Sequence, residues 1–127
     1  IFNYIIGNHD AHGKNFSILH KNGFELAPFY DLVSTQVYPL NNKFAMAIGR
    51  TFRLDRIKDH SFEIFAKVMN IRFSLLISLA NDMCSAVKKE LNGLIMEHKK
   101  HYGEAKIYED LNEVIKSNMA QLQRFFR

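Results

Sequence analysis

A short polar stretch near the start of the sequence, residues 8–15, gathers side chains that can transfer protons or bind cations. Within it, Asp10 precedes Asn15 by five positions. A carboxylate can accept or orient the proton of an attacking hydroxyl group. An amide oxygen is a hard ligand of the kind that Mg²⁺ accepts beside phosphate groups and water. These residue types at this spacing predict a reaction in which a hydroxyl group attacks a phosphate.

A second acidic residue, Asp31, is predicted to lie beside this loop because a hairpin separates them. Residues 16–20 and 24–28 have the composition of short strands, and Asn-Gly at 22–23 is a strong signal for a tight turn. If these two residues form the centre of the turn, Asn15 faces the residue just before Asp31. The hairpin would then hold an amide oxygen and a carboxylate together at its open end, where both could bind one Mg²⁺ ion.

Phosphoryl transfer requires the protein mainly to position groups and to neutralise charge. We expect Asp10 to orient or deprotonate the substrate hydroxyl, and Asn15 and Asp31 to hold Mg²⁺ across the phosphates of ATP. Lys14 would place a positive charge against the γ-phosphate, and His12 would brace the loop by hydrogen bonding. The Asp-to-Asn spacing is that of the catalytic loop of protein kinases. Each residue alone is also compatible with a cap or a turn, so the combination carries the interpretation.

Apolar periodicity predicts the elements that position this loop. The first seven residues are typical of the end of a buried helix, closed by Gly7 in the left-handed conformation. Residues 44–48 alternate in size as in a strand. From residue 61 onward the apolar side chains recur at helical spacing, and Ser61 is the expected N-cap of a short first helix.

Two long amphipathic helices are predicted to follow, over about residues 73–101 and 107–126. Cys84 falls on the apolar stripe of the first, so we expect a buried, unreactive thiol. The sequence therefore predicts an α+β, mostly helical fold, in which a small β-hairpin element carries the polar loop and three helices back it.

The polar loop and the segment after the hairpin form two motifs, Gly7-Asn8-x-Asp10-x-His12-x-Lys14-Asn15-x-Ser17 and Leu26-Ala27-Pro28-x-Tyr30-Asp31. Over about residues 3–50 they resemble the catalytic core of HipA-like serine/threonine kinases, the toxins of bacterial toxin–antitoxin pairs. The resemblance implies one domain over residues 1–127, a protein-kinase-like C-terminal lobe. Its catalytic and metal-binding loops would occupy residues 1–50 and its helical subdomain residues 51–127.

The resemblance also implies roles for single residues. Asp10 corresponds to the catalytic aspartate, Asn15 and Asp31 correspond to the metal-binding positions, and Lys14 and His12 match further positions of the pattern. ATP and Mg²⁺ are the implied cofactors, an aminoacyl-tRNA synthetase is the implied protein substrate, and a helix-turn-helix antitoxin is the implied partner and the only link to DNA. Such kinases also have an N-terminal lobe that binds nucleotide. We therefore expect this chain, which begins with an apolar segment and no methionine, to be an inactive fragment of a longer cytoplasmic protein.

The composition agrees with a single globular domain. The chain has 127 residues, of which 47% are apolar and 24% charged, and no apolar run reaches the roughly 18 residues of a membrane span. No signal-peptide pattern opens it. The single cysteine excludes an internal disulfide and indicates a reducing compartment. A net charge of +4 favours anionic ligands without indicating direct nucleic-acid binding.

Two other functions are compatible with parts of the sequence. The dipeptide His9-Asp10 with His12 nearby occurs in HD-type metal-dependent phosphohydrolases, which need further His and Asp ligands on other helices. A non-catalytic nucleotide- or DNA-binding module is the other alternative, although no zinc-ligand spacing or recognition-helix pattern supports it.

Overall fold

The computed structural model describes residues 1–41 and 43–126, and the chain is mostly helical with two small antiparallel sheets. The predicted α+β class is confirmed. The helices are α1 (Phe2–Ile6), α2 (Asp59–Val68), α3 (Phe73–Tyr102) and α4 (Lys106–Phe125), with 3₁₀ turns at Gly13–Asn15, Thr35–Val37 and Leu54–Arg56. The strands are β1 (Ile18–His20), β2 (Phe24–Leu26), β3 (Lys43–Ile48) and β4 (Thr51–Arg53).

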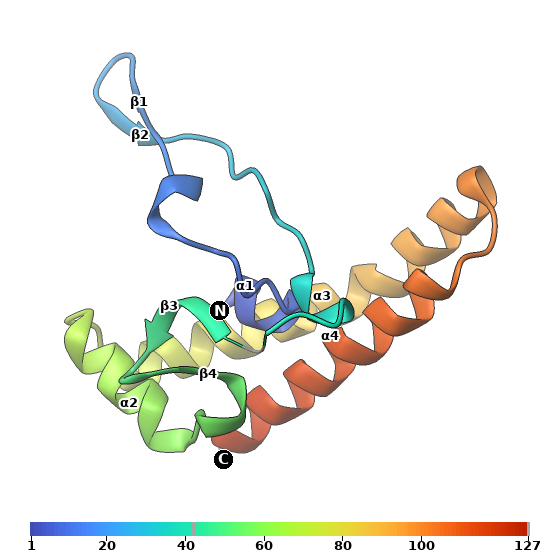
Figure 1. Cartoon of the computed structure of the whole chain (residues 1–127). Helices are drawn as coiled ribbons and strands as arrows, with labels where there is room; N and C mark the ends of the chain where they lie inside the picture. Colours follow the sequence, from blue (N-terminus) through green and yellow to red (C-terminus); the bar gives the residue numbers. More distant parts are fainter. Residues whose placement is uncertain (42, 127) are drawn as a thin grey trace.

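The two long helices form the base of the molecule, and the polar loop rises from it (Figure 1). Helices α3 and α4 run alongside each other, α1 packs against α4, and α2 packs against α3 and β3. The β1–β2 hairpin stands away from the helices at the end of two extended segments. Among the described residues, no helix combines the length and apolar character that crossing a bilayer requires.

Aromatic and aliphatic side chains from both ends of the chain form the core. Ile5 of α1, Phe62 of α2 and Leu122 of α4 are essentially inaccessible to solvent. The Phe62 ring meets the Tyr4 ring edge-on, with centroids 5.7 Å apart, and also contacts Phe125. Because these residues are far apart in sequence, their burial holds α1, and the loop that follows it, on the helical base.

The predicted stripe on the long helix α3 is confirmed. Its buried residues recur every four or seven positions, as expected for one face of a helix: Leu76, Ala80, Cys84 and Leu91. Burial raises the pKa of the Cys84 thiol, which agrees with the predicted unreactive cysteine. The left-handed conformation predicted for Gly7 is also present, with φ of 69°.

The predicted two-residue hairpin turn is wrong by one position. Leu19 pairs with Glu25 and His20 with Phe24, so the turn contains three residues, 21–23. A two-residue Asn-Gly turn needs positive φ at both residues. Here Gly23 has φ of 138°, whereas Asn22 does not have positive φ. The ladder is also shorter than predicted, so its pairing does not by itself bring Asn15 to Asp31.

The prediction that Ser61 caps α2 is also wrong. Helix α2 begins at Asp59, and Ser61 lies in its first turn, where its Oγ accepts a hydrogen bond from the Lys58 backbone N–H at 3.1 Å. The hydroxyl still satisfies a backbone donor at this helix end, but from within the helix rather than before it.

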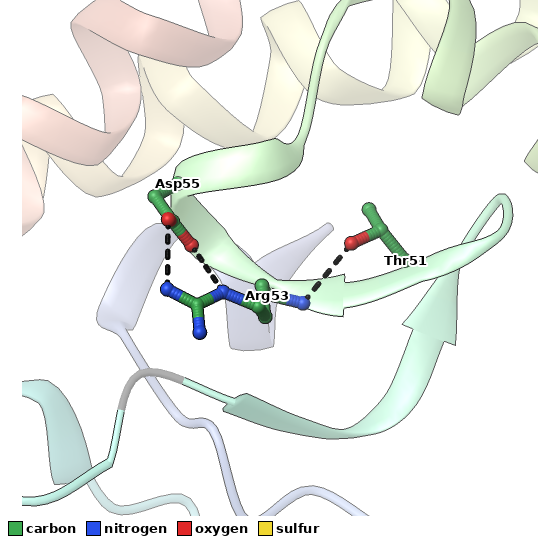
Figure 2. A network of polar contacts seen from close by, with 3 residues as sticks. All are labelled: Thr51, Arg53 and Asp55. Carbon is green, nitrogen blue, oxygen red and sulfur yellow. Dashed lines mark hydrogen bonds and ion pairs between the residues drawn. The ribbon is translucent and has the colours of Figure 1, made fainter.

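The sequence does not predict strand β4, which falls at the start of residues 51–127, the expected helical subdomain. Its end is shaped by polar contacts on the surface (Figure 2). Arg53 donates from Nε and Nη2 to the two carboxylate oxygens of Asp55, at 3.0 and 2.9 Å, and its backbone N–H donates to Thr51 Oγ1. The bond from Arg53 lowers the pKa of the Asp55 carboxyl. Both side chains are exposed, so the pair orders this turn locally and adds little to global stability.

Candidate active site

The structure brings Asn15 and Asp31 into direct contact. Asn15 Nδ2 donates a hydrogen bond to Asp31 Oδ2 at 2.8 Å, across 16 positions of sequence. The proximity expected from the hairpin is therefore confirmed, although the register that predicted it was wrong. This side-chain contact and the Tyr30 hydroxyl, which donates to the Lys14 carbonyl, close the open end of the hairpin.

The Asn15 side chain is held from two sides. Its Oδ1 accepts the backbone N–H of His12 at 3.0 Å, which closes the 3₁₀ turn over Gly13–Asn15. Its Nδ2 is engaged by Asp31. An amide oxygen has two lone pairs, so Oδ1 keeps one for a cation. The Asp31 carboxylate is exposed and likewise has unused acceptor capacity.

Asp31 adopts a backbone conformation that few residues other than glycine take, with φ of 58°. Aspartate tolerates this left-handed region better than most side chains, but the conformation persists only where neighbouring contacts hold it. The contact with Asn15 restrains the side chain of Asp31, and a buried amide described below restrains its main chain.

The remaining predicted residues lie on the same loop. Asp10 is exposed, and Lys14 is exposed beside Asn15. His12 contributes a hydrogen bond to the loop through its backbone N–H, and its ring Nδ1 is buried with no hydrogen-bonding partner among the described residues. Gly13 has no positive φ.

Asn8 is a site residue to which the sequence assigned no role. It is only 2% exposed, and its Nδ2 donates to the backbone carbonyl of Asp31 at 3.2 Å and to Asn3 Oδ1 at 3.3 Å. Its Oδ1 accepts the backbone N–H of Asp10 at 3.1 Å. The only signal in the sequence was its position beside Gly7 in the first motif.

The start of the polar loop is anchored by backbone contacts to two later segments. Thr35 Oγ1 accepts the His9 N–H at 2.8 Å and donates to the Gly7 carbonyl, which also accepts the Gln36 N–H at 3.0 Å. The His9 carbonyl accepts the Ala45 N–H at 2.7 Å, which links the loop to β3. These bonds fix the loop at its base while its outer part stays open to solvent.

His9 contributes to packing at this base rather than to the open site. Its ring lies edge-on to Phe44 with centroids 4.5 Å apart, and the residue is buried. Burial lowers the pKa of His9, which favours the neutral imidazole. The HD-type alternative requires a cluster of His and Asp ligands around a metal ion. Among residues 1–41 and 43–126, no three or more His, Cys, Asp or Glu side chains are arranged in this way.

A cavity of about 410 Å³ adjoins the Asn15–Asp31 contact. Asn8, Asn15 and Asp31 line it together with apolar side chains that include Phe16 and Phe29. A few polar side chains lining a largely apolar hollow are typical of small-molecule sites. The donor set fits Mg²⁺, which is commonly bound through one or two protein oxygens plus phosphates and waters.

Comparisons with known proteins identify the family of this chain and several relatives. The HipA-like C-terminal domain family matches residues 1–91. The chain is 41% identical over 97 residues to "Putative kinase Y4mE" of Sinorhizobium fredii, covering 72% of this chain and 23% of that protein. It is 39% identical over 80 residues to "Serine/threonine-protein kinase toxin HipA" of Shewanella oneidensis, covering 61% and 18% respectively. The matched region is thus about a fifth of each relative's length.

A solved structure shares the fold over nearly the whole chain. It is the HipA chain of a complex of HipA, HipB and operator DNA from Shewanella oneidensis, with a TM-score of 0.63 and 28% sequence identity. The similarity covers 98% of this chain and 28% of that one. With the family match over most of the sequence, the conclusion is direct: the chain belongs to the HipA-like C-terminal domain family.

Proposed function

We propose that this chain is the catalytic and Mg²⁺-binding lobe of an ATP-dependent protein serine/threonine kinase. The observation that carries the proposal is the 2.8 Å hydrogen bond from Asn15 Nδ2 to Asp31 Oδ2, which holds an amide group and a carboxylate together beside a cavity that both residues line. The kinase names of two relatives support the same reaction class.

Each loop residue has a defined task in this reaction. The oxygen of a substrate serine or threonine bonds to the γ-phosphorus of ATP, the bond from that phosphorus to ADP breaks, and Asp10 takes the hydroxyl proton. Asn15 and Asp31 would hold Mg²⁺, whose charge offsets that of the phosphates. Lys14, exposed on the same turn, would meet the γ-phosphate.

The rest of the machinery would come from outside residues 1–127, which we propose form a single domain of a longer kinase. The β1–β2 hairpin exposes Ile18, Phe24 and Leu26, apolar side chains suited to contact with an ATP-binding lobe. We further propose, by analogy with the HipA relatives, an aminoacyl-tRNA synthetase substrate, a helix-turn-helix antitoxin partner that provides the contact with DNA, and a cytoplasmic location.

The test is transfer of label from γ-labelled ATP to protein by the complete kinase in the presence of Mg²⁺. Wild type and Asp10→Asn are compared, with Asp82→Asn as a matched control because Asp82 is an exposed carboxylate on α3. Transfer by wild type and Asp82→Asn, but not by Asp10→Asn, would support the proposal. Equal transfer by all three would contradict the role of Asp10, and no transfer by folded wild type to itself or to tRNA-synthetase fractions would contradict the kinase function.

A further inference from the structure

Asn8 is a buried junction between the two segments that carry the proposed catalytic and metal-binding residues. Its amide nitrogen donates to the backbone carbonyl of Asp31, and its amide oxygen accepts the backbone N–H of Asp10. One side chain thus joins the main chain at both functional carboxylates. Exposed only 2%, it cannot exchange these partners for water without the site opening.

The chemistry of these contacts requires an amide. The Asp31 carbonyl and Asn3 Oδ1 are acceptors and need a donor, whereas the Asp10 N–H needs an acceptor. Only a side chain with a donor and an acceptor on one planar group supplies both. A carboxylate of the same shape would keep the bond from Asp10 but would set an oxygen against the Asp31 carbonyl, and an apolar side chain would lose every contact.

Asp31 depends on this support more than an ordinary residue would. Its φ of 58° is unfavourable for a residue with a side chain, so neighbouring contacts must hold it. Asn8 holds its carbonyl and Asn15 its carboxylate. The direction of the carboxylate is therefore set by two amides, one inside the protein and one at the surface.

We propose that Asn8 is a positioning residue that sets the Asp31 carboxylate for Mg²⁺ and fixes its placement relative to Asp10. This inference rests on the proposed kinase function for its link to Mg²⁺, but the junction itself does not. Partners that orient a metal-binding residue typically change metal affinity or activity about 10- to 100-fold when they are removed.

The test compares two isosteric changes in the complete kinase, Asn8→Asp and Asn118→Asp. Asn118 is a matched control because it is also 2% exposed and also donates to backbone carbonyls, those of Tyr4 and Ile5, without touching Asp10 or Asp31. We measure the Mg²⁺ concentration for half-maximal phosphoryl transfer, the thermal midpoint, and the chemical shift of the Asp31 carbonyl carbon, which accepts the hydrogen bond from Asn8.

We expect Asn8→Asp to raise the half-saturating Mg²⁺ concentration about tenfold and to move the carbonyl carbon resonance of Asp31 upfield, because this carbonyl loses the hydrogen bond from Asn8 Nδ2. Asn118→Asp should lower the thermal midpoint but leave the half-saturating Mg²⁺ concentration and the Asp31 carbonyl shift unchanged, because Asn118 touches Tyr4, Ile5 and Gln36 rather than Asp31. The proposal is overturned if Asn8→Asp lowers only the thermal midpoint, as Asn118→Asp does. If Asn8→Asp does not fold, Asn3→Ala removes one acceptor of the Asn8 amide, and it should give a smaller shift of the same sign; no shift in either readout would contradict the proposal.

The two hypotheses fail in different ways. If folded wild type transfers no phosphate, the kinase function and the Mg²⁺ role of Asn8 are both overturned, yet a changed Asp31 carbonyl shift in Asn8→Asp would still support the junction. If wild type is active with a normal Mg²⁺ response and Asn8→Asp matches it in both Mg²⁺ response and Asp31 carbonyl shift, the kinase function stands and the positioning role falls.

Discussion

Asn118 on α4 donates a hydrogen bond to Gln36 Oε1 at 2.8 Å, although 82 positions separate the two residues. The same Nδ2 group lies within hydrogen-bonding distance of the carbonyls of Tyr4 and Ile5, at 3.1 and 3.3 Å, where α1 ends. One buried amide therefore ties the last helix to the first helix and to the 3₁₀ turn that anchors the polar loop. This contact makes the fold of the helical region and that of the loop region interdependent.

Replacing Asn118 with leucine should destabilise the chain substantially. The carbonyls at the end of α1 and the Gln36 amide would lose a buried donor, and stranding such groups costs about 1–3 kcal/mol. Urea unfolding followed by circular dichroism measures the change. Asn92→Leu is the control, because Asn92 is exposed on α3 and its replacement should change the free energy of unfolding by less than about 0.5 kcal/mol. Equal stability of the two variants would contradict the structural role of Asn118.

Gly7 and Gly13 should respond in opposite ways to alanine. A Cβ at Gly7 would lie 2.7 Å from Gln36 Oε1, and its φ of 69° is unfavourable for alanine by about 1–2 kcal/mol, so Gly7→Ala should lower the free energy of unfolding by at least that amount. Gly13 has no neighbour within 4 Å of an added Cβ and no positive φ, so Gly13→Ala should be neutral or stabilise slightly. Thermal melts of both variants test this difference in stability. A Gly7→Ala variant with the thermal midpoint of wild type would contradict the left-handed conformation at the end of α1.

Periodicity and turn chemistry predicted the helices well because they depend on local spacing. The stripe through Ala80 and Cys84 on α3 needed no knowledge of the partner surface. The hairpin register was harder, because the Asn-Gly pair is compatible with a two- or a three-residue turn and the choice depends on the φ of Asn22. The proximity of Asn15 and Asp31 was predictable all the same, because either turn length brings the chain back alongside itself. The direct contact depends on the side chains of Asn15 and Tyr30 rather than on the strand pairing.

The buried amides could not be found from the sequence. Asn118 lies within the apolar stripe of α4, where its spacing marks it as core but its type does not. Its role depends on carbonyls left free where α1 ends, more than a hundred positions earlier. Asn8 likewise acquires its partners only when the segment containing Asp31 folds back over the loop. Long-range polar contacts of this kind are products of the tertiary fold.

His9 should make the stability of the chain depend on pH below neutrality. Burial lowers its pKa from the ordinary value of 6.5, so the unfolded chain binds a proton more readily than the folded chain does. The contribution of the neutral, buried His9 ring to the stability of the folded chain is complete above pH 6.5. It is lost as the pH falls from there through the folded-state pKa of His9. Urea unfolding at several pH values gives the free energy of unfolding as a function of pH. Its dependence on pH should be weaker for His9→Gln, whereas His20→Gln, on the exposed hairpin, should behave as wild type. An unchanged slope in His9→Gln would rule out this source of pH dependence.

Asp31→Asn should remove Mg²⁺-dependent phosphoryl transfer while preserving the fold. Asparagine tolerates the left-handed φ that Asp31 adopts, and its amide oxygen can still accept the bond from Asn15, so the free energy of unfolding should change by less than about 0.5 kcal/mol. The substitution removes the one negative charge that we assign to the metal site, and Mg²⁺ strongly prefers a carboxylate there. Transfer from γ-labelled ATP by the complete kinase, titrated with Mg²⁺, measures the loss, with Asp82→Asn carried in parallel. Normal turnover by a folded Asp31→Asn protein would overturn the assignment of Asp31, because the Asn15–Asp31 contact would then be structural only.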